Sequence, residues 1–231
     1  MIDWDRIEKF IGFGRRDAPV VFIGMEERLT SDDALDDDLA IRSRYESPVM
    51  DLREASPGSA EAERYFDPDR PPRQPTWRVM ADLMLRRDGA AHPTTEERRQ
   101  YRALRLGRAD GDTLLAELLP YPHPKSSDWL YERFGKFHTR AEYATKMLPE
   151  RIRMLREVIS ESRRELVVCY GKTNWSEYEA LFYDLSWCDD GDFRVAQGSM
   201  RVVLTPHASG RAFNTDAQLE RLAAIAVGSG G

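Results

Sequence analysis

The sequence has little cysteine, little histidine and no long apolar run, and each shortage excludes a class of protein. Its 231 residues include two cysteines and four histidines. Two cysteines cannot build a disulfide framework, a four-cysteine zinc site or a four-cysteine iron–sulfur cluster. We therefore expect Cys169 and Cys188 to be reduced thiols in a cytoplasmic protein.

No apolar run approaches the roughly 18 residues that a membrane-spanning helix requires. The first ten residues, MIDWDRIEKF, carry three acidic side chains and lack the apolar stretch of a signal peptide. We therefore expect no membrane partner. The composition, 41% hydrophobic and 32% charged, is that of an ordinary globular protein with a real core, and we expect a monomer.

The net charge of −6 is spread unevenly along the chain. The segment Ser31–Leu39 holds five aspartates, whereas Arg64–Arg108 holds eleven arginines against six acids. Such runs are usually solvated surface, and we favour this interpretation. A uniformly acidic protein would bind nucleic acid poorly, so the alternative is a basic face for phosphate that the acidic loop offsets.

Buried strands are predicted where short apolar runs end in glycine or proline. Pro19–Gly24, Leu166–Gly171 and Met200–Pro206 have this form and are rich in β-branched residues. Thr113–Leu119 is a weaker fourth candidate, because its leucines also fit the spacing of a helical turn. These runs predict a short, mainly four-stranded parallel sheet.

Amphipathic helices are predicted between the strands and after the last one. The last helix opens with a capping box of Thr215 and Gln218. Strands that alternate with helices favour an α/β fold, here a three-layer α/β/α sandwich with right-handed crossovers. We predict a single domain, residues 1–231, with a helical and loop insert at about 31–108. The predicted helices span Thr76–Arg87, Thr95–Leu106, Pro149–Arg163 and Thr215–Val227.

Unusual residues follow the first predicted strand at its carboxyl end, the edge at which parallel sheets bind ligands. Gly24 would let a ligand approach the backbone closely, and the carboxylates Glu26 and Glu27 come next. The two acids could instead open a helix, because the helix dipole favours acids in the first turn.

His207 lies just past the last predicted strand, in the turn TPHASGR. Histidine is a common catalytic group, although a loop histidine can equally be held by hydrogen bonds for structure alone. We expect Gly24 and His207 to lie close together, at the carboxyl ends of adjacent or nearly adjacent strands. Tyr121, in the extended run Pro120–Pro124, is either a platform for a flat ring or part of a stiff surface loop.

Taken in order, these segments resemble the uracil-DNA glycosylase superfamily, as a divergent member. The first motif of that family is a strand ending in Gly-x-Asp/Asn-Pro or Gly-x-x-Pro-Gly, and Val20–Glu27 reads VVFIGMEE. Its last motif is a strand ending in His-Pro-Ser-x-Leu/Arg, and Val202–Arg211 reads VVLTPHASGR. The His-x-Ser-x-Arg-x-x-Asn run that ends at Asn214 is most similar to the single-strand-selective branch.

The sequence also departs from the family pattern. Glu26 stands where the family has the Asp or Asn that orients the attacking water, and Glu27 and Ala208 stand where it has prolines. The family reads its base with an Asn after the second strand, where this chain has Glu117 and the Pro120–Pro124 run. The resemblance therefore supports the fold more than it supports uracil specificity.

The resemblance implies a DNA-repair hydrolase that cleaves the N-glycosidic bond of a damaged base turned out of the DNA stack. His207 would donate a hydrogen bond to the departing base, and Glu26 would position or deprotonate the water. No metal or other cofactor is needed. Contacts to the base or to phosphate would come from Gly24, Tyr121, Ser209, Arg211 and Asn214.

The alternative function is that of a protein that binds a nucleotide or nucleobase and keeps the fold without the activity. The overall acidity of the chain favours this alternative, because it disfavours duplex DNA. A third hypothesis is an interaction protein whose insert, Ser31–Leu106, covers the site.

Overall fold

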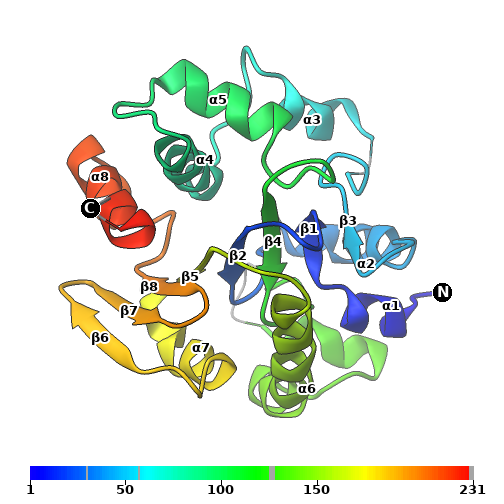
Figure 1. The fold of residues 1–231 in the computed structure, drawn as a ribbon. Coiled ribbons are helices and arrows are strands. Elements are labelled where there is room, and N and C mark those ends of the chain that lie inside the picture. The colour runs from blue at the N-terminus through cyan, green and yellow to red at the C-terminus, as the bar shows by residue number, and fades with distance from the viewer. Residues whose placement is uncertain (30, 57, 125–127, 229–231) are drawn as a thin grey trace.

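The computed structural model describes residues 1–29, 31–56, 58–124 and 128–228 (Figure 1). Within these ranges the chain forms one eight-stranded mixed sheet and eight α-helices. The strands lie side by side in the order β3-β1-β4-β2-β5-β8-β7-β6. They span β1 Gly12–Gly14, β2 Val20–Gly24, β3 Val49–Met50, β4 Thr113–Glu117, β5 Leu166–Tyr170, β6 Trp187–Asp190, β7 Phe193–Gln197 and β8 Arg201–Thr205.

The α/β class is confirmed, but the sheet is larger than predicted. All four predicted segments form strands, and β4, β2, β5 and β8 pair in parallel. β1 pairs antiparallel with β4, and the hairpin of β6 and β7 adds two antiparallel strands beyond β8. The added strands escaped prediction because they are short or partly exposed and have no continuous apolar run.

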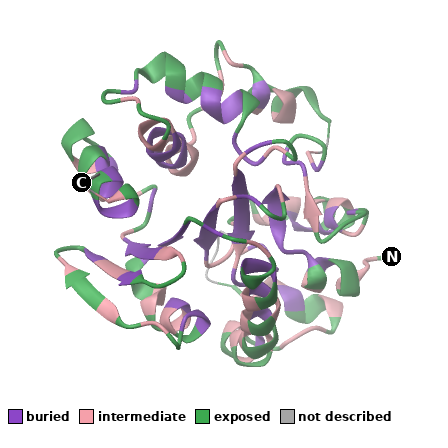
Figure 2. Ribbon diagram, in the orientation of Figure 1, coloured by how far each residue is buried: buried purple, intermediate pink, exposed green. Residues whose placement is uncertain are grey.

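Helices cover both faces of the sheet. Alternate residues of a strand point to opposite faces, so Val20 and Phe22 of β2 pack in the core that includes residues of α4 and α8. Val21 and Ile23 pack in the other core, with residues of α6 and α7. Figure 2 shows the central strands buried, with exposed residues on the outer sides of the helices. The helices are α1 Trp4–Lys9, α2 Leu35–Arg42, α3 Ala60–Glu63, α4 Pro75–Arg87, α5 Thr95–Leu104, α6 Arg140–Ser160, α7 Trp175–Leu181 and α8 Asp216–Val227.

The helix predictions hold, with one change of length. The capping box of α8 is present, since the Thr215 hydroxyl accepts from the Gln218 amide at 3.3 Å. α6 begins at Arg140 and carries Pro149 inside it, whereas the sequence predicts a start at Pro149. The Thr139 hydroxyl caps α6 by accepting from the Glu142 amide at 3.1 Å, so the helix gains two turns upstream of the proline.

The insert at 31–108 packs onto the rest of the chain. β3 pairs with β1, and α4 packs against α8 in the same core. The buried carboxylate of Asp82 on α4 binds Arg98 on α5 at 2.7 Å, and Arg98 also binds Asp216 at 2.8 Å. The insert is thus joined to the first turn of the last helix by an ion-pair network.

In the described part of the chain, no helix has both the length and the apolar character needed to cross a membrane.

The two thiols differ in exposure, which gives a direct test of the strand assignments. Cys169 is buried in β5 and burial raises its pKa, whereas Cys188 is exposed on β6. Because the thiolate is the reactive form, we expect maleimide to add once to the native protein, at Cys188, and twice in urea. Intact-mass measurement over time checks this. Rapid double addition under native conditions would show that β5 is not a core strand.

Candidate functional site

A hollow opens at the carboxyl ends of β2 and β4, and we call it the strand-end hollow. It has an inner part of about 50 Å³ and an outer part of about 250 Å³. The two parts share five lining residues, Phe13, Glu27, Arg42, Leu52 and Trp77. Glu117 and Tyr170 line the inner part, so carboxylate, phenol and guanidinium groups meet among apolar walls. This composition is typical of a small-molecule site.

Gly24, the last residue of β2, makes room for two polar side chains. A Cβ at this position would collide with Glu117 Oε2 and with the Tyr170 hydroxyl. The Tyr170 hydroxyl donates a hydrogen bond to Glu117 Oε1 at 3.1 Å. Gly24 is therefore required by the side chains of the hollow, and the close approach of a ligand to its backbone stays a prediction.

Glu117 is an acid in an environment that favours its neutral form. Burial raises its pKa well above the ordinary value, and the nearby carboxylate of Glu27 raises this pKa further. Its Oε2 atom is buried and has no hydrogen-bond partner among the described residues. Burial and the neighbouring Glu117 also raise the pKa of Tyr170, so this hydroxyl keeps its proton.

Glu27 is the acid after β2 that faces the hollow. It forms an ion pair with Arg42 on α2, and Arg42 also binds Asp38 at 2.6 Å. No helix begins at Glu26 and Glu27, because the segment after β2 runs extended and bridges to His123 at Arg28. The helix-opening interpretation of these acids is therefore wrong.

Glu26, the predicted catalytic acid, does not line the hollow. Its side chain is 8% exposed, forms an ion pair with Arg140, and lies 3.7 Å from His123 Nδ1. Successive residues of an extended segment point in opposite directions. Glu26 and Glu27 therefore face different sides, and Glu27 is the one that lines the hollow.

His207 follows β8, and its ring stands edge-on to the Tyr170 ring at 5.9 Å between centroids. The Ser209 amide donates to His207 Nδ1 at 3.2 Å, and the Ser209 hydroxyl lies 2.7 Å from the same nitrogen. Because Nδ1 accepts, the neutral ring carries its proton on Nε2. Partial burial lowers the pKa of His207 and so favours this neutral form.

Gly24 and His207 follow nearly adjacent strands, as predicted. β5 lies between β2 and β8, and all three run in the same direction. Tyr170 at the end of β5 joins the two sides, since its hydroxyl reaches Glu117 and its ring contacts His207. The carboxyl edge of the sheet thus holds both predicted residues.

The prediction that Tyr121 stacks on a base is wrong. Tyr121 is 1% exposed, and its ring stacks on Tyr131 and Tyr143 at centroid distances of 4.9 and 4.7 Å. Its hydroxyl binds Glu8. The proline-rich run is therefore core and not a surface platform, because aromatic rings from the 3₁₀ turn Leu130–Phe134 and from α6 cover it.

The other predicted binding residues lie in the turn after β8 and are exposed: Ser209, Arg211 and Asn214. Ser209 orients His207, as described. Asn214 contributes its amide, which donates to Gln218 Oε1 at 2.9 Å in the cap of α8. Arg211 has no ion pair within the described ranges.

Sequence reasoning missed Arg42 and Trp77, which come from the insert and wall the hollow. No local motif marks either residue, since both reach the site through tertiary packing. Tyr170 and Glu117 each end a predicted strand, so the strand-end rule that selected Gly24 would have found them.

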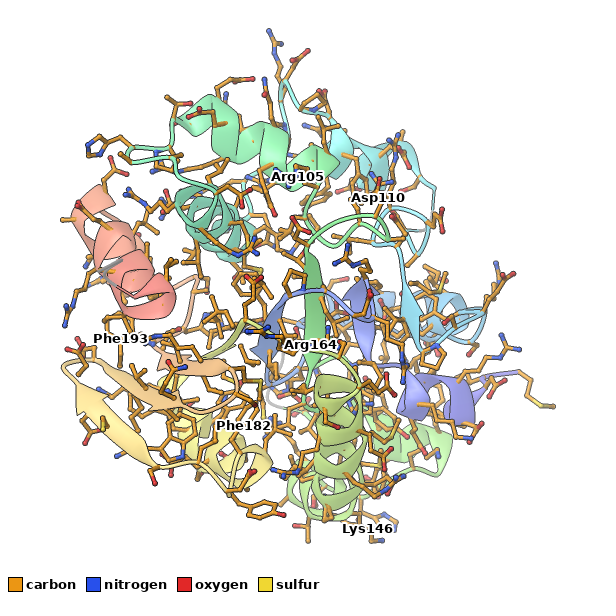
Figure 3. The ribbon with its side chains drawn as sticks, in the orientation of Figure 1. Arg105, Asp110, Lys146, Arg164, Phe182 and Phe193 are labelled. Carbon is orange, nitrogen blue, oxygen red and sulfur yellow. The ribbon has the colours of Figure 1, made fainter. Side chains whose placement is uncertain are left out.

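Most arginines of the basic run are already paired. Arg105 (Figure 3) lies 3.3 Å from Asp88 and 3.4 Å from Asp112. Arg87 binds Glu165 at 2.6 Å, and Arg108 binds Asp51 at 2.8 Å. The favoured interpretation of this run as protein surface, without a continuous phosphate-binding face, agrees with these pairs.

A cavity larger than the strand-end hollow lies away from these groups. It measures about 740 Å³ at the amino ends of β5 and β8, and Arg164 and Phe182 line it (Figure 3). Arg164 donates only to backbone carbonyls, and Arg156 on its rim binds Asp184 at 3.0 Å. Size alone does not make it the reactive site, because Arg164 and Arg156 are already bound within the protein.

Comparisons with known proteins do not supply a family. No protein-family model matches the chain, and no curated protein matches it significantly. The function is therefore inferred from the residues at the carboxyl edge of the sheet.

Proposed function

We propose that the protein is a divergent uracil-DNA glycosylase-like hydrolase, which binds a nucleobase in the strand-end hollow and cleaves its N-glycosidic bond in DNA. One observation carries this proposal: each of four parallel strands brings a polar side chain to the same edge. These are Glu27 after β2, Glu117 on β4, Tyr170 on β5 and His207 after β8.

The proposed fold is a uracil-DNA glycosylase-like α/β/α sandwich centred on these four strands. Its support is the parallel run of β4, β2, β5 and β8, with α4 and α8 in one core and α6 and α7 in the other. The first and last motifs of the family then fall at one edge of the sheet, where such sheets bind ligands.

In the proposed reaction, His207 stabilises the charge that develops on the departing base. Its Nε2 carries the proton, so it can donate a hydrogen bond to an oxygen of that base. A fixed donor aimed at developing charge contributes more in the transition state than in the bound substrate. The Ser209 amide donates to Nδ1 and so keeps the ring in this tautomer.

Glu27 replaces Glu26 as the carboxylate that positions the attacking water. It faces the hollow, and its ion pair with Arg42 fixes its orientation. A carboxylate within reach of a water acts as a general base. Glu26 instead serves the contact with Arg140.

Trp77 replaces Tyr121 as the aromatic partner of the base. It lines both parts of the hollow and is only partly buried, and Tyr65 packs against it at 5.7 Å between ring centroids. Enzymes that extrude a base commonly stack it on an aromatic or apolar wall. The insert would thus complete the pocket and not close it off.

Arginines near the turn after β8 supply contacts for phosphate. Arg78 on α4 binds the carbonyl of Phe213, and Arg73 lies near enough to lower the pKa of Arg78 beyond the effect of burial. Arg211 is exposed two residues before Phe213. Guanidinium groups therefore lie near the turn after β8, although the chain as a whole is acidic.

Removing one of these charges tests the DNA partner. We expect Arg211→Ala to weaken binding of a labelled single-stranded oligonucleotide and to reduce the salt slope by about one phosphate contact. Fluorescence anisotropy at three salt concentrations measures both. Arg163→Ala is the matched control, because Arg163 is an exposed arginine at the opposite edge of the sheet.

The same titration can reject the proposal. If the wild type has no affinity for DNA at low salt, where electrostatic binding is strongest, it is not a DNA glycosylase. If the wild type does bind DNA, a cleavage assay on oligonucleotides that carry uracil, hypoxanthine or xanthine identifies the base that it removes.

A second candidate function is binding of a free nucleobase or nucleotide without cleavage. The observation that favours it is the charge of the outer part of the hollow, where the carboxylates of Glu27 and Asp38 share one guanidinium, that of Arg42. An acidic entrance repels a phosphodiester chain. Under this function, free bases bind but the oligonucleotide does not.

A further inference from the structure

Glu117 carries an oxygen atom that no described residue uses as a hydrogen-bond partner. Its Oε2 atom is buried and has no partner among the described residues, although the residue lines the strand-end hollow. Buried polar atoms are nearly always paired, with protein, water or a ligand. An unused oxygen in the wall of a pocket therefore indicates a group that is paired when the pocket is filled.

We propose that Glu117 selects the ligand as a neutral carboxylic acid, donating a hydrogen bond from Oε2 to a ring nitrogen or carbonyl oxygen of the bound heterocycle. This inference rests on the proposed function, in which the hollow is a nucleobase site. It adds the group that reads the base and the kind of base that the group can read.

The contacts of Glu117 place its proton. Oε1 accepts from the Tyr170 hydroxyl at 3.1 Å, which leaves Oε2 to carry the hydrogen. Of the two arginines that line the inner part, Arg42 is already shared by Glu27 and Asp38, and Arg151 donates to backbone carbonyls. If Glu117 were ionised, its buried carboxylate would have no cation as a partner. Proteins avoid such an unpaired buried charge by keeping the acid protonated.

Every charged or titratable group near Glu117 is accounted for on the elements that surround it. The carboxylates favour its neutral form and the cations oppose it, but burial is the largest influence. Arg151 binds the backbone carbonyl of Glu117 and not its carboxyl group. The neighbouring groups are Glu26 and Glu27 after β2, Tyr170 on β5, Arg42 on α2, Arg151 on α6 and Tyr178 on α7.

A neutral acid and an ionised acid select different ligands. The neutral acid offers one donor beside one acceptor, which matches a lactam edge, N–H beside C=O, or an amidine edge, N beside NH₂. An ionised carboxylate offers two acceptors and matches two adjacent donors. The structure therefore favours a base with a lactam or amidine edge, a class that includes uracil and hypoxanthine.

The test uses uracil and hypoxanthine as probes, with binding followed by calorimetry from pH 5 to 9. For the wild type we expect affinity to fall as the pH rises through the pKa of Glu117. Glu117→Gln keeps one donor and one acceptor, so we expect it to bind within about threefold of the wild type at pH 5 and to lose that pH dependence. Glu117→Ala should bind at least tenfold more weakly at pH 5.

Two controls separate binding from folding. Glu220→Gln, at an exposed acid on α8, should keep the wild-type pH profile. Thermal unfolding of each variant verifies that the fold is intact. Any pH dependence that comes from His207 remains in Glu117→Gln, so the difference between the two profiles belongs to Glu117.

The outcomes distinguish this inference from the function on which it rests. Binding that survives Glu117→Ala overturns the selection by Glu117 and leaves the nucleobase site in place. Loss of binding in Glu117→Gln, with wild-type binding that strengthens as the pH rises, shows that the ionised form is the reader and also overturns it. Failure of the wild type to bind either base at any pH overturns the nucleobase site and, with it, the inference.

Discussion

Arg151→Met is expected to reduce the free energy of unfolding by roughly 3–5 kcal/mol, the range for breaking a buried charged interaction. Arg151 on α6 is 0% exposed. Its guanidinium donates to four backbone carbonyls, those of Leu118, Glu8, Phe10 and Glu117, at 3.2, 3.1, 2.9 and 2.7 Å. Methionine fills much of the space but donates nothing, so these carbonyl oxygens lose their partners.

Urea unfolding measures this loss, provided that the slope of the transition is unchanged. Arg153→Met is the matched control on the same helix, because Arg153 is exposed and pairs only with Glu150 and Glu157. Surface ion pairs contribute about 0–1 kcal/mol, so the control should shift the midpoint little. If the two variants unfold at the same urea concentration, the hydrogen bonds of the buried Arg151 do not stabilise the fold.

His207→Ala is expected to slow turnover about 10²–10³-fold while leaving the affinity for the substrate nearly unchanged. This expectation rests on the proposed glycosylase function. The hydrogen bond from Nε2 strengthens only as charge develops on the departing base, so its loss affects the transition state more than the bound state. Single-turnover cleavage and anisotropy, measured on the same oligonucleotide, separate the two quantities.

Ser209→Ala serves as the graded control for His207. It removes the hydroxyl 2.7 Å from Nδ1 but keeps the backbone amide that also donates to this nitrogen. We expect a loss of about tenfold or less, in the range of one neutral hydrogen bond. If His207→Ala instead weakens binding and leaves the single-turnover rate of cleavage unchanged, the histidine holds the ligand and takes no part in the reaction.

The central strands could be predicted from the sequence because burial on both faces leaves a clear mark. Runs such as VVFIG and LVVCY are apolar throughout, and the ends of these strands then locate Gly24 and His207. The outer strands leave no such mark: β1 reads GFG, and β6 reads WCDD with two exposed central residues. Short, half-exposed strands are defined by their pairing partners and not by their composition.

The details of the site depend on geometry that a linear pattern does not contain. Side chains alternate in direction along the extended segment after β2, so a shift of one residue would decide whether Glu26 or Glu27 faces the hollow. Trp77 reaches the hollow only because α4 packs against the sheet. The prolines around Tyr121 predict an extended loop, but they do not reveal that the rings of Tyr131 and Tyr143 bury it.

The two outermost strands determine how the sheet meets other copies of the chain. An exposed edge is a template for strand addition, and proteins block it with short strands and with charge. β3 offers two residues, and β6 carries adjacent aspartates, Asp189 and Asp190. These aspartates are held by Arg194 and Arg221. An approaching strand must bury or displace these ion pairs, so growth of the sheet from molecule to molecule is disfavoured at both ends.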